Sequence, residues 1–178
     1  MTAQLDSTPQ LPAAPAGGAI GVPDVVHGAS EGDATSQYIT FTIGTEEYGV
    51  DVMAVREIKA WTESTALPNS PEYVRGVVNL RGHIIPIFDL RCRFGQGLTE
   101  PTPTHVIIIT TINDRVVGIL ADTVSDILSI RREDIRPVPM MDRDVDREFL
   151  SGLVSVQDRM VALLTLERLF DTKAIPAT

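Results

Sequence analysis

Apolar and polar residues alternate with a period of two over much of the chain, and pairs of turn-forming residues interrupt the alternation. The segment 38–43 alternates in this way and passes through Gly44 and Thr45 into 47–51, which predicts a β-hairpin. Further strand pairs are predicted at 104–112 with 115–120, at 77–80 with 84–90, and within 153–164. Short strands joined by local turns favour a mainly β fold of small Greek-key or SH3-like barrels over a parallel α/β sheet.

The same order of elements occurs twice along the chain. Residues 48–58 are echoed by 117–127, with Gly, aliphatic, Val, acidic and Ile positions in register. Residues 76–90 are likewise echoed by 152–166, with glycines and aliphatic residues at matching places. An internal repeat of this kind predicts two similar lobes.

Composition divides the chain into a tail and a folded domain. Residues 1–36 are rich in Pro, Gly and Ala, contain no Lys or Arg, and predict a disordered tail. The folded domain is expected over 37–170, with lobes at roughly 37–94 and 104–170, and 171–178 as a C-terminal tail. Each lobe alone is near the lower size limit for a stable core, so we expect the lobes to pack together and leave a binding groove at their junction.

Three short segments have a less regular pattern. An extended conformation would place Val55, Glu57 and Lys59 on one face, which we expect to be exposed. The succession of Ser, Pro and Glu in 70–76 predicts a helix of one turn that ends at a glycine. Helical spacing of apolar residues in 166–170 predicts a terminal helix.

Charge and cysteine content narrow the class of function. The chain has 24 acidic against 15 basic residues and a net charge of −9, which opposes binding to nucleic acid or to an anionic membrane surface. A single cysteine, Cys92, excludes an intramolecular disulfide, and we expect a soluble protein of a reducing cytoplasm. The longest aliphatic runs are far shorter than the ~20 residues that a membrane-spanning helix needs.

Catalytic motifs are absent from the sequence: it has no phosphate-binding loop, no His-Glu-x-x-His, no Cys pair for zinc and no Gly-x-Ser-x-Gly. The histidines, His27, His83 and His105, lack metal-ligand spacing, and we interpret each as a solvated side chain. A small enzyme would have to use Cys92, His83 and Asp89. Arginines on both sides of Cys92 could lower its pKa, but we favour an inert thiol.

Arg81 and Gly82 form a predicted turn beside the expected groove. An arginine there offers a forked donor for a carboxylate or carbonyl group of a partner. Taken alone, Arg81 is better explained as a surface turn residue without a partner, and Glu57 as an ordinary exposed acid, so a functional interpretation rests on their combination.

A series of motifs in fixed order gives these residues a context. The motifs are EEYGVDV at 46–52, VREI at 55–58, Pro71, GV at 76–77, NLRG at 79–82, PI at 86–87, DL at 89–90, VGI at 117–119 and DTVSDI at 122–127. In this combination the chain, from about Gln37 to Phe170, strongly resembles the family of the chemotaxis coupling protein CheW. The resemblance implies two five-stranded SH3-like barrels and a non-catalytic adaptor without a cofactor.

The resemblance also implies partners and site residues. The partners are the regulatory domain of the histidine kinase CheA and the cytoplasmic tip of methyl-accepting chemoreceptors, in arrays at the inner membrane. The implied receptor contacts are Val55, Glu57, Gly76, Arg81 and Ile127, and the implied kinase contacts are Arg136 and Met141. The family often has an aromatic residue where this chain has Met141, although methionine can also fill an apolar pocket. The alternatives are a coupler for a pilus or developmental system and, from another class, the small enzyme.

Overall fold

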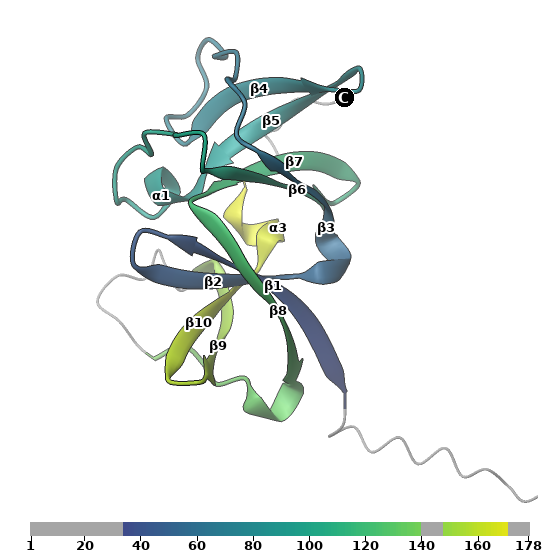
Figure 1. Cartoon of the computed structure of the whole chain (residues 1–178), viewed down its shortest axis with the longest axis vertical. Coiled ribbons are helices and arrows are strands. Elements are labelled where there is room, and N and C mark those ends of the chain that lie inside the picture. The colour runs from purple at the N-terminus through teal and green to yellow at the C-terminus, as the bar shows by residue number, and fades with distance from the viewer. Residues whose placement is uncertain (1–33, 140–147, 171–178) are drawn as a thin grey trace, which may run out of the picture.

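The computed structural model describes residues 34–139 and 148–170, which form ten strands in two five-stranded sheets (Figure 1). The first sheet has the order β8 (Thr123–Arg131), β1 (Thr35–Ile43), β2 (Glu46–Asp51), β10 (Arg159–Leu164) and β9 (Leu150–Val156). The second sheet has the order β3 (Val55–Ala60), β6 (Val106–Ile112), β7 (Arg115–Ala121), β5 (His83–Asp89) and β4 (Val74–Leu80). The short helices are η1 (Val52–Ala54), α1 (Leu90–Arg93), η2 (Arg132–Asp134) and α3 (Leu166–Leu169). The predicted fold class, mainly β with two SH3-like lobes, is confirmed.

The hairpins form where the alternation and the turn residues predict them. In β1 the side chains of Ile39, Phe41 and Ile43 are buried on one face. The turn between β6 and β7 holds Asn113 and Asp114 at φ of 47° and 64°, the left-handed region that these two residues tolerate better than most. Local turn chemistry therefore fixes the register of each hairpin.

The two lobes do not follow one another along the chain, so the predicted division into 37–94 and 104–170 is wrong for the sheets. The hairpin β1–β2 pairs with β8 and β10 from the second repeat, and β9 extends that sheet beyond β10. The hairpin β6–β7 pairs with β3 and β5 from the first repeat, and β4 extends that sheet beyond β5. Both sheets consequently have the same order of equivalent strands. The chain crosses to the second sheet through η1 and returns to the first after β7, which makes the two repeats exchange strands.

Matching glycines allow the parallel strand pairs that complete the exchange. Gly118 of β7 lies beside Ile87 of β5, and a Cβ at Gly118 would approach the Ile87 Cδ1 atom to 2.5 Å. Gly49 of β2 lies in the equivalent place beside Leu163 of β10, where a Cβ would come within 2.9 Å of the leucine Cδ2. The repeated glycine of the sequence thus marks a close strand approach in each sheet.

The largest apolar cluster lies between the sheets and takes buried residues from both, including Phe41, Phe88 and Ile108. A smaller cluster lies within the second sheet and comprises Ile85, Ile87, Ile107, Ile109 and Leu120. Its counterpart in the first sheet comprises Ile130, Val154, Val161 and Leu163. Because the large cluster is shared, neither lobe has a complete core of its own.

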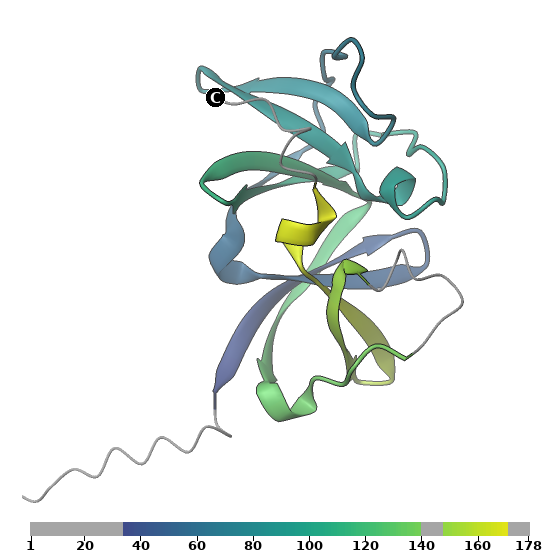
Figure 2. The same ribbon diagram turned by 180° about the vertical axis from the view of Figure 1, so that it is seen from behind.

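The predicted terminal helix is present as α3, which Figure 2 shows between the two sheets. Leu169 is fully buried, and the ring of Phe170 packs on that of Phe88 with centroids 4.3 Å apart. Arg93 of α1 donates from Nε to the carbonyl oxygen of Leu169 (3.0 Å), and its guanidinium lies over the Phe149 ring. These contacts fasten the end of the domain to both lobes.

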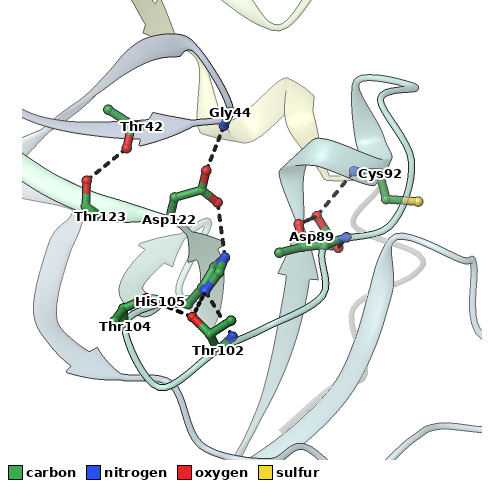
Figure 3. A network of polar contacts seen from close by, with 10 residues as sticks. Thr42, Gly44, Asp89, Cys92, Thr102, Thr104, His105, Asp122 and Thr123 are labelled. Carbon is green, nitrogen blue, oxygen red and sulfur yellow. Dashed lines mark hydrogen bonds and ion pairs between the residues drawn. The ribbon is translucent and has the colours of Figure 1, made fainter.

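A polar clasp, formed by Asp122, His105, Thr102 and Gly44, also joins the sheets (Figure 3). The Asp122 carboxylate accepts the backbone N–H of Gly44 in the β1–β2 turn (2.7 Å) and lies 3.3 Å from His105 Nε2. Since the backbone N–H of Thr102 donates to His105 Nδ1 (3.0 Å), the Nε2 atom of the neutral ring carries the proton toward Asp122. The His105 side chain is 14% exposed, so the interpretation of this histidine as solvated is wrong.

The one-turn helix predicted in 70–76 does not form. The Ser70 hydroxyl donates back to the Leu67 carbonyl oxygen instead of capping a helix, and the Val74 N–H closes a turn on Pro71. The strand β4 begins at Val74, so too few residues remain for a helix. Over residues 34–139 and 148–170, no helix has both the length and the apolar character needed to span a membrane.

Candidate functional site

A cavity of about 250 Å³, which we call the rim cavity, opens at the edge of the second sheet. It is lined by residues of all five strands and the β4–β5 turn: Arg56, Glu57, Leu80, Arg81, His83, Ile84, Ile85, Ile109 and Val116. Five of these nine residues are aliphatic, and three others, Arg56, Glu57 and Arg81, are charged. The sequence placed the binding groove at the junction of the lobes, whereas every residue of this cavity lies in the strands of the second sheet or in its β4–β5 turn.

An ion pair between Arg81 and Glu57 crosses the mouth of the rim cavity. The Arg81 Nη2 atom lies 2.9 Å from Glu57 Oε2, and the arginine side chain is 77% exposed. The predicted turn holds Arg81 and Gly82 at φ of 52° and 87°, and the Gly82 N–H donates to the Asn79 side chain (2.9 Å). The turn therefore projects the guanidinium away from the sheet toward β3.

Glu57 faces inward rather than toward solvent, so the expectation of an exposed face at Val55, Glu57 and Lys59 is wrong. Glu57 pairs across the sheet with Ile109, whose side chain is buried in the cluster of the second sheet. Residues directly opposite in an antiparallel pair share a face, so the glutamate points into the same interior. Its side chain is 25% exposed.

The second carboxylate oxygen of this glutamate gives the site its binding chemistry. Glu57 Oε1 is buried and has no hydrogen-bond partner in the described part of the chain. A buried carboxylate oxygen without a donor is costly, and a partner's N–H or O–H group would satisfy it once the Glu57 side chain turns outward. The rim thus offers a forked donor and an acceptor above an aliphatic cavity, which suits an amphipathic protein surface.

The other implied receptor residues are spread more widely. Val55 begins β3 and is half-buried against the shared core. Gly76 is buried in β4 under Thr65, so it shapes the surface without contributing a side chain. Ile127 lies on β8 of the first sheet, paired with Ile39, and is 54% exposed. Three of the five residues therefore lie in strands of the second sheet and Arg81 lies in its β4–β5 turn, whereas Ile127 lies in the first sheet.

Of the two implied kinase residues, Arg136 is exposed, and Met141 lies outside the described residues. The backbone of Arg136 exchanges two hydrogen bonds with Leu153 of β9, at 2.7 and 2.8 Å. This bridge is the counterpart of the one between Thr65 and Val77 in the second sheet. Arg136 is consequently held at the first sheet, away from the Glu57–Arg81 pair.

Sequence reasoning missed Ile84, which lines the rim cavity and is 51% exposed. It stands next to Ile85, so the two isoleucines lie on opposite faces of β5 and alternation does not mark either as a surface residue. The sequence does carry one signal. The run of apolar residues in β5 is longer than one buried face can hold, so some of them must be exposed if the other face is solvated.

His83 does not lie with Cys92 and Asp89, the other two residues of the alternative enzyme. His83 begins β5 and Asp89 ends it, so the length of the strand separates them. Asp89 is fully buried and accepts hydrogen bonds from Thr99 N (2.7 Å), Thr99 Oγ1 (2.8 Å) and Cys92 N (3.2 Å), as Figure 3 shows in part. Among the described residues, no group of His, Cys, Asp and Glu could hold a metal ion.

We expect slow alkylation of Cys92. Burial raises the pKa of its thiol, the charges of Asp89 and Glu72 raise it further, and Arg75 offsets part of the effect. Since the thiolate is the nucleophile, iodoacetamide should modify the folded protein more slowly at pH 7.5 than the same protein in urea. The difference in rate should shrink as the pH rises further. The thiol of the unfolded protein is already ionised above about pH 9, so only the folded thiol gains reactivity beyond that point. Equal rates of alkylation in the folded and the unfolded protein at pH 7.5 would contradict the interpretation of Cys92 as inert.

Comparison with known proteins places this geometry in a family. A sequence model of the CheW-like domain matches residues 37–174. A probable chemotaxis protein CheW of Rhizobium etli is 45% identical over 145 residues, which cover 82% of this chain and 92% of the relative. The chemotaxis protein CheW of Klebsiella aerogenes is 40% identical over 137 residues, covering 77% and 82%.

A solved structure agrees with the fold. The crystal structure of the scaffolding protein TtCheW from Thermoanaerobacter tengcongensis matches with a TM-score of 0.70 and 31% identity, over 79% of this chain and 91% of that one. The chain therefore belongs to the CheW-like family, and its role is that of an adaptor in chemotaxis signalling.

Proposed function

We propose that the protein couples methyl-accepting chemoreceptors to the histidine kinase CheA and helps to build receptor–kinase arrays. Membership of the CheW-like family carries this proposal, and the chemotaxis names of the relatives favour it over a pilus or developmental system. In this role the protein works in the cytoplasm beside the inner membrane, without catalysis of its own and without inserting into the bilayer.

The receptor surface of the proposal is the mouth of the rim cavity, with Glu57 and Arg81 as its polar contacts. A helical hairpin at the tip of a receptor can present an apolar side chain to the aliphatic cavity and polar groups to the rim. Arg81 has guanidinium nitrogens beyond the one that binds Glu57, and Glu57 has an unpaired oxygen. Val55 and Ile127 would extend the apolar part of this contact.

The kinase surface of the proposal includes Arg136 and Met141. Arg136 is anchored to β9 in the first sheet, whereas the receptor surface is centred on the second. Surfaces on separate sheets allow one copy of the protein to bind both partners at the same time, which is what an adaptor needs.

A sedimentation assay tests the proposal. Receptor-bearing membranes should pull down purified CheA when this protein is added, and much less without it. A large excess of the protein should lower the amount of CheA again, because separate copies then occupy receptors and kinase. Membranes without receptors are the control. An unchanged amount of sedimented CheA over the whole titration would contradict the coupling role.

A further inference from the structure

A second groove, which we call the Trp61 groove, lies at the opposite ends of β3 and β4 from the rim cavity. It has a volume of about 550 Å³ and is lined by Trp61, Glu63, Ser64, Arg75, Pro101, Thr102 and Pro103. Trp61 directly follows β3, Arg75 lies in β4, and the two prolines lie in the segment that leads into β6. None of these residues belongs to the proposed receptor or kinase surface.

The Trp61 groove has the chemistry of a polyproline site. Trp61 is half-buried with its side chain against the cluster of the second sheet, so its ring is held in place. Its indole N–H has no hydrogen-bond partner among the described residues, which leaves it free to donate to a peptide carbonyl group. Aromatic grooves of this kind bind peptides in the polyproline II conformation, which lose little entropy on binding.

The chain carries a matching ligand in its own N-terminal sequence. Pro9, Pro12 and Pro15 are spaced three residues apart, and Asp6 stands three residues before Pro9. A polyproline II helix has three residues per turn, so in that conformation these four side chains share one edge. One edge would then carry three proline rings and a terminal carboxylate.

Charge complementarity determines the orientation in which this segment would bind the groove. Residues 1–33 contain acidic residues and no Lys or Arg. The guanidinium of Arg75 forms no ion pair within the described residues, and Glu63 would repel an acidic flank on its own side. The Asp6 end of the segment therefore belongs beside Arg75.

The position of β1 favours binding of the segment to a second copy of the chain. Figure 1 shows β1 beginning at the end of the molecule that lies far from the second sheet. As a flexible linker, residues 16–34 would span roughly 25 Å on average. A compact domain of this size is about 35–40 Å across. The groove of a neighbouring copy is subject to no such limit.

We propose that residues 9–15 of one copy bind the Trp61 groove of a second copy, with Asp6 beside Arg75. The contact would link copies of the adaptor through their tails and is independent of the receptor and kinase surfaces. It would be weak in dilute solution and gain importance where copies are concentrated.

The fluorescence of Trp61 tests this proposal, because it is the only tryptophan in the chain. A synthetic peptide of residues 5–17, titrated into the full-length protein at low micromolar concentration, should cause a saturable change in tryptophan emission. A matched peptide with alanine at positions 9, 12 and 15 should bind at least about tenfold more weakly. An R75E substitution should weaken the binding of the proline peptide and leave the tryptophan emission of the peptide-free protein unchanged.

The full-length protein without peptide tests whether the bound segment comes from the same copy or from another copy. Its emission should change in the same way as its concentration is raised, and a P9A/P12A double variant should lose that change. Emission that does not respond to the peptide, or that responds equally to the alanine peptide, would overturn the assignment of the groove. A bound-state spectrum at every dilution would show docking within one copy and overturn the link between copies.

Discussion

Replacing Gly76 by alanine should destabilise the domain by about 2–6 kcal/mol, of which backbone strain and the steric clash each contribute roughly 1–3 kcal/mol. The residue has φ of 130°, and a Cβ there would overlap the carbonyl oxygen of Thr65 and lie 2.7 Å from its carbonyl carbon. These are backbone atoms held by the two hydrogen bonds between Thr65 and Val77, so they cannot move aside cheaply. The melting temperature should fall by on the order of 10–20 °C.

Gly82 provides the matched control for this experiment. It also has a positive φ, 87°, but a Cβ at Gly82 would meet no atom within 4 Å. G82A should therefore cost only the conformational strain, about 1–2 kcal/mol. Urea unfolding followed by circular dichroism measures both variants. Equal losses at the two positions would show that the clash with Thr65 is not decisive, and that Gly76 is not primarily a structural residue.

Reversing the charge of Arg81 should have the largest effect on receptor binding. We expect R81E to weaken receptor affinity by about 1–3 kcal/mol, or roughly 5- to 150-fold, because it removes the forked donor and sets a second carboxylate beside Glu57. The R81K substitution keeps the charge but loses the planar fork, so it should retain part of the affinity. Stability should change by less than about 1 kcal/mol, since the pair is largely exposed on the arginine side.

Arg159 offers a control of the same chemical kind in the first sheet. It begins β10 and lies 3.2 Å from Glu47 of β2, with its side chain 47% exposed. R159E breaks a comparable ion pair and changes the net charge by the same amount. It should leave receptor affinity unchanged when measured by sedimentation with receptor membranes. An equal loss in R159E and R81E would attribute the effect to overall charge.

The strands and hairpins were predictable because their causes are local. Alternation specifies which residues of β1 are buried, and turn residues such as Asn113 and Asp114 set where a hairpin reverses. The exchange of strands between repeats was not predictable in this way. The pairing of β10 with β2 and of β5 with β7 joins segments far apart in the chain, and the same alternating pattern would fit sequential lobes equally well.

The candidate site was predictable only at the turn. Arg81 and Gly82 are recognisable as a turn, and the structure confirms it. Glu57 was placed on the wrong face because a charged residue in a strand is expected to point toward solvent, whereas here it faces inward at the open edge of the lobe. A β-bulge between Val55 and Glu57 adds to the irregularity of β3. The cavity wall could not be assembled from sequence, since Ile109 and Val116 come from strands of the other repeat.

A charge swap between the two rim residues tests the central claim most directly. The double variant E57R/R81E can restore an ion pair across the rim cavity with its polarity reversed. If Glu57 and Arg81 contact the receptor, the double variant should fold as stably as the wild type and still bind CheA. Its receptor affinity should remain as low as that of R81E. Recovery of wild-type receptor affinity in the double variant would contradict the account, because it would mean that the pair serves only to hold the fold together.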